Sequence, residues 1–213
     1  IMEGRGIPAK GAFPSSFSYG NDSVDTVSYD PEEAKKLLEE SGWKDTDGDG
    51  YADKDGQKLT INWLTYPTRL EQPKLAEYAQ ATLKEIGIDV QVNNTSDHRT
   101  YAENGDFDVY VSSTTTAPTG DPEYFFTSTV TGAKNYGNYQ NEEVTKLTDQ
   151  LHQTFDKEKR GELAVKLQQQ ILDDDAFFFV SHLNMGIVTK SNVTGLEAHP
   201  CDYYEITADL DIN

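Results

Sequence analysis

The sequence has one cysteine, few basic residues and no long apolar run, and each scarcity excludes a class of protein. A single cysteine, Cys201, excludes an internal disulfide framework and a zinc site built from several cysteines. The 18 basic residues stand against 37 acidic ones, a net charge of −19, so the chain lacks the basic face that nucleic acid or an anionic membrane requires. Because no apolar stretch is long enough to span a bilayer, we expect no membrane insertion.

Catalytic motifs are also missing. The sequence contains no HExxH, GxSxG, Walker A or GxGxxG motif, and no nucleophile–base spacing, so a hydrolase would rest only on scattered histidines and aspartates. The segment HPCD brings three types of metal ligand into four residues, but such adjacent ligands need another from elsewhere in the chain. We therefore expect that the protein is not an enzyme. The candidate side chains are His98, His152, His182, His199, Cys201 and Asp202.

The sequence does contain enough apolar residues for a core, since 36% of its 213 residues are hydrophobic. Residues 1–29 are rich in glycine and proline and predict an extended, irregular segment. Asp30 is a good N-cap for a helix that starts at Pro31 and stops at Gly42.

Strand and helix patterns alternate after this helix. Strands are predicted over 59–66, 88–93 and 107–113, with a helix over 72–86 between the first two. This order indicates βαβ units with a largely parallel sheet, hence one α/β domain. Further on, helices are predicted over 141–154 and 157–172, followed by strand-like segments over 176–182 and 185–190. The three phenylalanines of the first of these segments are typical of a strand buried on both faces.

The acidic segment DTDGDGYADKDG, residues 45–56, has the front half of a calcium-binding loop. Carboxylates fall at loop positions 1, 3, 5 and 9, and a glycine at position 6, but Gly56 occupies position 12, where a bidentate glutamate belongs. The alternative is a Gly/Asp turn in which the aspartates accept hydrogen bonds from their own backbone. Under both interpretations the loop is structural. The candidate calcium ligands are Asp45, Asp47, Asp49, Tyr51 through its carbonyl, and Asp53.

A polar and aromatic segment, residues 114–140, follows the strand over 107–113. Ligands of open α/β sheets gather at the carboxyl ends of strands. Threonine hydroxyls, one carboxylate and aromatic side chains here favour a pocket for a small polar ligand with a cationic end. The alternative is that Asp121 caps a short helix while Phe125 and Phe126 turn to the core. A cap and a pocket wall can share this turn.

Several quoted stretches in this order carry a family resemblance: YDPEEAKKLLEESGWKDTDGDGYADKDGQKLTINWLTY, LKEIGIDVQV, GDFDVYVSS with GDPEYFF, and YGNYQNEEVTKLTDQL. Together they resemble the extracytoplasmic solute-binding proteins of ABC importers, in the branch that handles peptides, nickel and opines. The resemblance implies a two-lobed clamp that closes on a solute and delivers it to a membrane permease. Residues 1–213 would be its C-terminal lobe, of the periplasmic-binding-protein type with a mixed, mostly parallel sheet flanked by helices. Residues 1–29 would enter from the hinge, and the first lobe would be absent.

The resemblance also implies site residues. An aspartate matching Asp121 meets the amino terminus of the ligand in peptide binders, and the lining expected beside it is Thr115, Thr116 and Tyr124. Nickel-chelate binders carry Trp and Tyr before the DP pair and His after it, where this chain has Thr116, Gly120 and Glu123. The ending LEAHPCDYYEIT nevertheless resembles the nickel branch, which leaves a nickel chelate as the alternative solute and returns His98, His182 and His199 as candidate ligands.

The resemblance places the protein outside the cytoplasm, with a lipid anchor expected on the complete protein and ABC permease subunits as partners. Members of the family often carry such a Gly/Asp stretch between helix and strand, away from the ligand cleft, so the resemblance implies a turn with optional Ca²⁺. A calcium-dependent structural or adhesion module remains the alternative from another class.

Overall fold

The computed structural model describes residues 1–198 and 206–213, and the chain in it forms two compact units. One, here named the sheet unit, comprises Val27–Ser113 with Ile1; the other, the helical unit, comprises Met2–Thr26 and Thr114–Asn213. Each unit is described by itself, and the expectation of one lobe over 1–213 stays a prediction.

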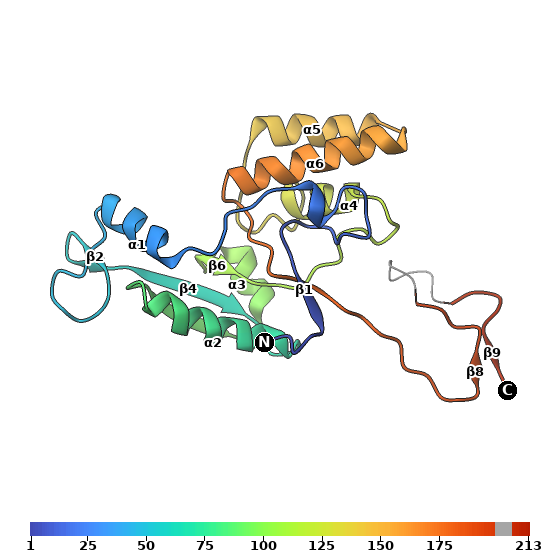
Figure 1. Cartoon of the computed structure of the whole chain (residues 1–213), viewed down its shortest axis with the longest axis horizontal. Helices are drawn as coiled ribbons and strands as arrows, with labels where there is room; N and C mark the ends of the chain where they lie inside the picture. Colours follow the sequence, from blue (N-terminus) through green and yellow to red (C-terminus); the bar gives the residue numbers. More distant parts are fainter. Residues whose placement is uncertain (199–205) are drawn as a thin grey trace. The chain divides into compact units, whose positions relative to one another are not determined.

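The sheet unit holds a three-stranded sheet in the order β5-β4-β6. Both pairings are parallel, as the alternating strand and helix pattern predicted. Residues of β4 pair with β5 along the whole strand, from Thr60 opposite Asp89 to Thr65 opposite Asn94. Helix α2 packs on this pair (Figure 1), and Ala76 of the helix, Leu64 of β4 and Val90 of β5 are all buried. The elements are α1 Pro31–Glu40, β2 Asp53–Lys54, β3 Gln57–Lys58, β4 Thr60–Thr65, α2 Glu71–Lys84, β5 Asp89–Asn94, α3 His98–Asn104 and β6 Val109–Tyr110.

Local signals set several of these bounds. Asp30 accepts a hydrogen bond from the Glu33 N–H at 3.0 Å, so the predicted N-cap of α1 is confirmed. Helix α2 ends two residues earlier than predicted, and Gly87 turns the chain into β5 with φ +85. A side chain at Gly87 would meet the Ala52 N atom at 3.0 Å, so both the backbone angle and the space favour glycine.

The helical unit is built on the antiparallel pair α5 and α6, which lie side by side (Figure 1). Their apolar stripes face a core of aromatic rings, in which Phe13 makes edge-on contacts with Tyr19, Phe125 and Phe126. The elements are β1 Gly6–Pro8, η1 Asn21–Ser23, α4 Glu123–Phe125, the π-helical turn η2 Phe126–Val130, α5 Glu142–Gln153, α6 Lys157–Asp173, β7 Ser181–Leu183, β8 Val193–Thr194 and β9 Asp211–Ile212.

The predicted irregularity of residues 1–29 is confirmed in part, since the segment contains only β1 and η1. It is nevertheless integral to the helical unit, because Phe13 is fully buried and β1 pairs antiparallel with β7. Buried Gln168 of α6 accepts a hydrogen bond from the Ala12 N–H at 3.0 Å and donates one to the Tyr19 carbonyl at 2.7 Å. These bonds satisfy backbone groups that the irregular segment would otherwise bury unpaired.

The strand predictions near the C-terminus were wrong in extent. Only Ser181–Leu183 forms a strand in the first segment, and residues 185–190 form none. The buried strand expected from the three phenylalanines is also wrong. Phe177 and Phe179 stack and pack against the core while Phe178 is 79% exposed, so the apolar run supplies two core rings from irregular backbone. Likewise, the strand predicted over 107–113 covers Val109–Tyr110 alone.

Candidate functional site

The segment 114–140 belongs to the helical unit and contains the short helix α4 (Figure 1). Phe125 and Phe126 turn into the core, at 2% and 0% exposure, whereas Tyr124 is 39% exposed. Asp121 accepts a hydrogen bond from the Glu123 N–H at 2.9 Å at the start of the helix. The alternative interpretation of this turn, a helix cap at Asp121 with Phe125 and Phe126 in the core, is therefore confirmed. Of the three rings only Tyr124 remains exposed.

Asp121 forms a bidentate ion pair with Arg160 of α6. The guanidinium donates from Nε to one carboxylate oxygen at 2.9 Å and from an Nη atom to the other at 2.6 Å. Arg160 is largely buried, and Asp121 is partly exposed. Burial raises the pKa of Asp121, but the hydrogen bonds from Arg160 and from the Glu123 N–H outweigh it and leave the pKa below its ordinary value.

Arg160 also binds Glu123, whose carboxylate lies 2.7 Å from the same Nη atom. The other oxygen of Glu123 lies 2.6 Å from Nδ1 of exposed His152 on α5. Burial raises the pKa of Glu123, but the hydrogen bonds from Arg160 and His152 have the larger effect. The pKa is therefore below its ordinary value. Arg160 completes its contacts with the carbonyls of Leu151 and Thr154 at the end of α5. One guanidinium thus joins the 114–140 segment to the α5–α6 turn.

Tyr19 provides a second attachment for the same segment. Its hydroxyl donates to the Gly120 carbonyl at 2.8 Å, across 101 residues of sequence. Burial, reinforced by the charge of Asp121, raises the pKa of Tyr19, so the hydroxyl remains a donor at all ordinary pH values. The segment is therefore attached on both sides of Asp121, through the Gly120 carbonyl to Tyr19 and through the Glu123 carboxylate to Arg160.

The predicted contact residues Thr115 and Thr116 lie in the same segment, Thr115 exposed and Thr116 partly buried. Lys134, which the sequence did not single out, joins Tyr124: its Nζ lies 3.2 Å from the Tyr124 hydroxyl and 5.5 Å from the centre of the ring. The structure thus groups the predicted residues in one attached segment. Their contact with a solute stays a prediction.

The acidic loop lies in the sheet unit. In the part of the chain that the structure describes, the group of side chains able to converge on a metal ion is Asp45, Asp47 and Asp49, with one oxygen of each within 4.8 Å of the others. The same carboxylates accept hydrogen bonds from backbone N–H groups of the loop, as in the Gly/Asp turn. All three are exposed, so these bonds are compatible with either interpretation.

The remaining calcium ligands are placed less favourably. The Asp53 carboxylate accepts bonds from the hydroxyl and the N–H of Thr46, at 2.6 and 2.8 Å, and these bonds lower its pKa. The ligand at loop position 9 often contacts the cation through a water molecule, so Asp53 would bind a cation through water and not directly. The ring of Tyr51 lies under the ammonium groups of Lys58 and Lys84, and its carbonyl remains a predicted ligand. Calcium binding therefore stays a prediction.

Of the three histidines named as candidate nickel ligands, the structure describes His98 and His182, which lie in different units. His98 stacks on Tyr66 in the sheet unit, and its Nδ1 lies 2.6 Å from the Tyr110 hydroxyl. Burial, with the charge of Arg99, lowers the pKa of His98. His182 lies on β7 in the helical unit, where burial lowers its pKa. Its Nε2 atom is buried and has no hydrogen-bond partner among the described residues. The predicted HPCD ligands His199, Cys201 and Asp202 lie outside the described residues.

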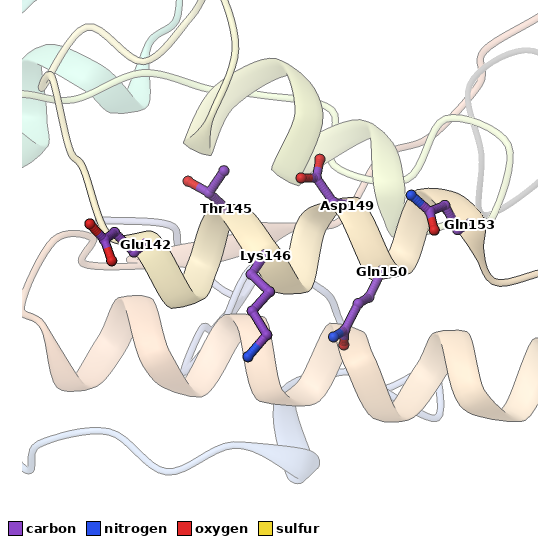
Figure 2. Close-up of a pocket in the computed structure, with 6 residues that line it drawn as sticks. All are labelled: Glu142, Thr145, Lys146, Asp149, Gln150 and Gln153. Atoms are coloured by element: carbon purple, nitrogen blue, oxygen red, sulfur yellow. The ribbon is translucent and has the colours of Figure 1, made fainter.

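A surface hollow on α5, shown in Figure 2, does not coincide with the predicted site. All its lining residues come from that one helix and are polar or charged, so it has no opposing wall to enclose a solute. The lining residues are Glu142, Thr145, Lys146, Asp149, Gln150 and Gln153.

Three site residues escaped sequence reasoning: Tyr19, Lys134 and Arg160. Arg160 is one of only four arginines in the chain, which is a weak signal of a specific ion pair. Its partner is 39 residues away, and no spacing rule links a loop aspartate to the first turns of a later helix. Tyr19 lay in a segment expected to be extended.

Comparison with known proteins gives a consistent result. A model of the bacterial extracellular solute-binding proteins, family 5 Middle, matches residues 1–137. The oligopeptide-binding protein AppA of Bacillus subtilis (strain 168) is 30% identical over 200 residues, which are 91% of this chain and 37% of AppA. The AppA structure with a nonapeptide has a TM-score of 0.76 at 27% identity and covers 93% of this chain and 41% of its own.

A nickel ABC transporter structure from Bacillus halodurans has the same TM-score of 0.76 at 27% identity, over 100% of this chain and 45% of that chain. The chain thus spans about two fifths of the length of these relatives. These relatives confirm the expected α/β architecture of the periplasmic-binding-protein type. In the described part of the chain, none of the helices has both the length and the apolar character needed to cross a bilayer. The family match covers more than half of the sequence, and the chain belongs to the bacterial extracellular solute-binding proteins of family 5.

Proposed function

We propose that the chain is the C-terminal lobe of a two-lobed binding protein that captures short peptides outside the cytoplasm. The observation that carries the proposal is the family match over residues 1–137, together with 30% identity to an oligopeptide-binding protein over 91% of the chain. The chain corresponds to about two fifths of that relative, which leaves room for a first lobe. An ABC permease would receive the solute, and a lipid anchor on the complete protein is part of the proposal.

Within this lobe, we propose the segment 114–124 as a solute-binding part. The Tyr19 and Arg160 contacts support this role, because a fixed loop loses little conformational entropy when a solute binds. Thr115, Thr116 and Tyr124 offer hydroxyl groups and an aromatic face. Asp121 remains in the proposed site, and because its carboxylate already pairs with Arg160, its loss would affect the loop as well as any contact with the solute.

The mechanism we propose is closure and release, with no chemical step. The two lobes would close on the solute, and the contacts made only in the closed state would shift the population towards it. The permease would then recognise this state. We propose a carrier because the family to which the chain belongs consists of solute-binding proteins.

A nickel chelate is the second candidate solute. It is favoured by the nickel ABC transporter structure, which matches the chain with the same TM-score and identity as the AppA structure. The departures at Thr116, Gly120 and Glu123 favour the peptide.

A thermal-shift screen of the full-length protein tests the proposal. A ligand that binds only the native state raises its stability by about 2.7 kcal/mol at one hundred times Kd. We expect short peptides of two to nine residues to raise Tm by several degrees, and free amino acids to have no such effect. A rise only with Ni²⁺ in excess histidine would select the nickel alternative. No rise with either set would contradict the proposed function.

A further inference from the structure

The segment 114–140 contains only three charged side chains, Asp121, Glu123 and Lys134. The charge that a solute meets there depends on which of the three already has an ionic partner. Both carboxylates do, because Arg160 binds the two together.

Arg160 has no donor left for a solute. A guanidinium carries five N–H donors, and all five are used: two bind Asp121, one binds Glu123, and two bind the carbonyls of Leu151 and Thr154. Such a largely buried, fully bonded arginine acts as an anchor. Breaking its pair with Asp121 would leave a largely buried charge with fewer partners. A ligand ammonium that approached Asp121 would have to compete with Arg160, which already binds both oxygens of the carboxylate.

Lys134 differs from both acids. Among the described residues no carboxylate pairs with its ammonium, although acids outnumber bases 37 to 18 in the chain. Its contacts are with the hydroxyl and the ring face of Tyr124, which hold the ammonium at the side of an exposed aromatic ring. An ammonium has three donors, and the Tyr124 hydroxyl takes one. No other acceptor for this ammonium is found among the described residues, so two donors are left for a solute.

We propose that Lys134 binds a carboxylate of the solute, and that Asp121 is a positioning residue which Arg160 holds in place. This inference rests on the proposed function and adds the orientation of the solute. The segment would bind the anionic end of the solute, whereas the family resemblance implied an ammonium contact at Asp121. A peptide C-terminus and the carboxylates of a metal chelate offer the same chemistry, a charge-assisted N–H···O⁻ bond.

The test is isothermal titration of the full-length protein with tetra-alanine, its C-terminal amide and its N-acetyl form. We expect the amide to bind the unmodified protein at least tenfold more weakly than the free acid. In Lys134→Met the acid and the amide bind equally, and in Lys134→Arg the preference for the acid returns. Lys146→Met is the matched control, because Lys146 is an exposed lysine of the same unit that pairs with Glu143. It keeps the full preference.

The positioning role is tested by Asp121→Asn, Arg160→Met and the double variant. If the two residues act as one anchor, the double variant loses no more affinity than the weaker-binding single variant. The ratio of the affinities for the free acid and the amide then stays near that of the unmodified protein. N-acetylation of the peptide lowers the affinity by the same factor in Asp121→Asn as in the unmodified protein. Loss of the acetylation penalty in Asp121→Asn would show that Asp121 meets the ammonium and would overturn this part.

Failure of the inference is distinguishable from failure of the proposed function. Equal binding of acid and amide by the unmodified protein overturns the Lys134 assignment and leaves the peptide function standing. If no peptide form binds, the same variants are titrated with Ni²⁺ in excess histidine. If Lys134→Met binds the chelate tenfold more weakly and Lys146→Met binds it unchanged, the carboxylate that Lys134 binds belongs to a chelate. Binding of neither solute, or chelate binding unchanged in Lys134→Met, overturns the inference.

Discussion

Replacing Gln168 by leucine tests how the N-terminal segment is held in the helical unit. Gln168 is fully buried in α6, and its amide bonds the Ala12 N–H and the Tyr19 carbonyl. Leucine has similar volume but no polar atoms, so both backbone groups lose their partner. A side chain at Gly11 would lie 2.6 Å from the Gln168 oxygen, so the segment packs tightly on this amide and has little freedom to find other partners.

The magnitude follows from these two groups. Each unpaired buried group costs about 1–3 kcal/mol, or about 4 kcal/mol for the pair at mid-range. The added apolar surface of leucine offsets about 2 kcal/mol. We therefore expect the free energy of unfolding to fall by about 2 kcal/mol, and with a typical urea m-value of about 2 kcal/mol/M the midpoint falls by about 1 M.

The assay is urea unfolding followed by far-UV circular dichroism, because α5 and α6 lie in the same unit as Gln168. Tryptophan fluorescence is unsuitable, since both tryptophans, Trp43 and Trp63, lie in the sheet unit. Gln170→Leu is the matched control, a neighbouring glutamine whose amide bonds the exposed Asp174 carboxylate. We expect its effect to be below about 0.5 kcal/mol. Equal midpoints for the two variants would refute the reasoning.

Three further predictions concern the core, the acidic loop and pH. Phe126→Ala removes a fully buried ring from the aromatic core and lowers the free energy of unfolding by about 3–5 kcal/mol, measured in the same urea assay; a loss below about 1 kcal/mol would contradict this packing. If the acidic loop binds calcium, 1 mM Ca²⁺ raises Tm relative to excess EGTA, and Asp47→Asn abolishes the difference; identical Tm values would remove the calcium prediction. The depressed pKa values of Asp121 and Glu123 stabilise the folded state above their ordinary values of 3.8 and 4.5, and this stabilisation is lost as pH falls through the folded-state values. Acid unfolding of Asp121→Asn should therefore depend less steeply on pH than that of the unmodified protein, and equal slopes would count against the Arg160 contacts as the cause.

Sequence reasoning succeeded where the signal is local. The helices over 142–153 and 157–173 follow from apolar residues three or four apart, and their predicted bounds were within one residue of those observed. The cap at Asp30 and the parallel pairing of β4 with β5 depend on neighbouring residues and on the length of one connecting helix. The family resemblance came from the order of such segments and was confirmed.

It failed where distant residues decide the structure. An apolar run such as 177–179 is compatible with a buried strand or with an irregular segment beside a core, and only the position of α4 and its rings distinguishes the two. The partner of Asp121 could not be predicted either, because the choice between a ligand ammonium and Arg160 depends on how α6 packs. The residue types of the site were readable from the sequence, but its charge balance was not.

Native mass spectrometry of the full-length protein, purified gently from cells in rich medium, tests the central claim most directly. The account predicts a series of bound masses that match short peptides, weakened together by Lys134→Met and unaffected by Lys146→Met. Bound species that carry a transition-metal isotope pattern, or a protein without any bound mass under conditions that retain non-covalent ligands, would contradict the peptide-binding function.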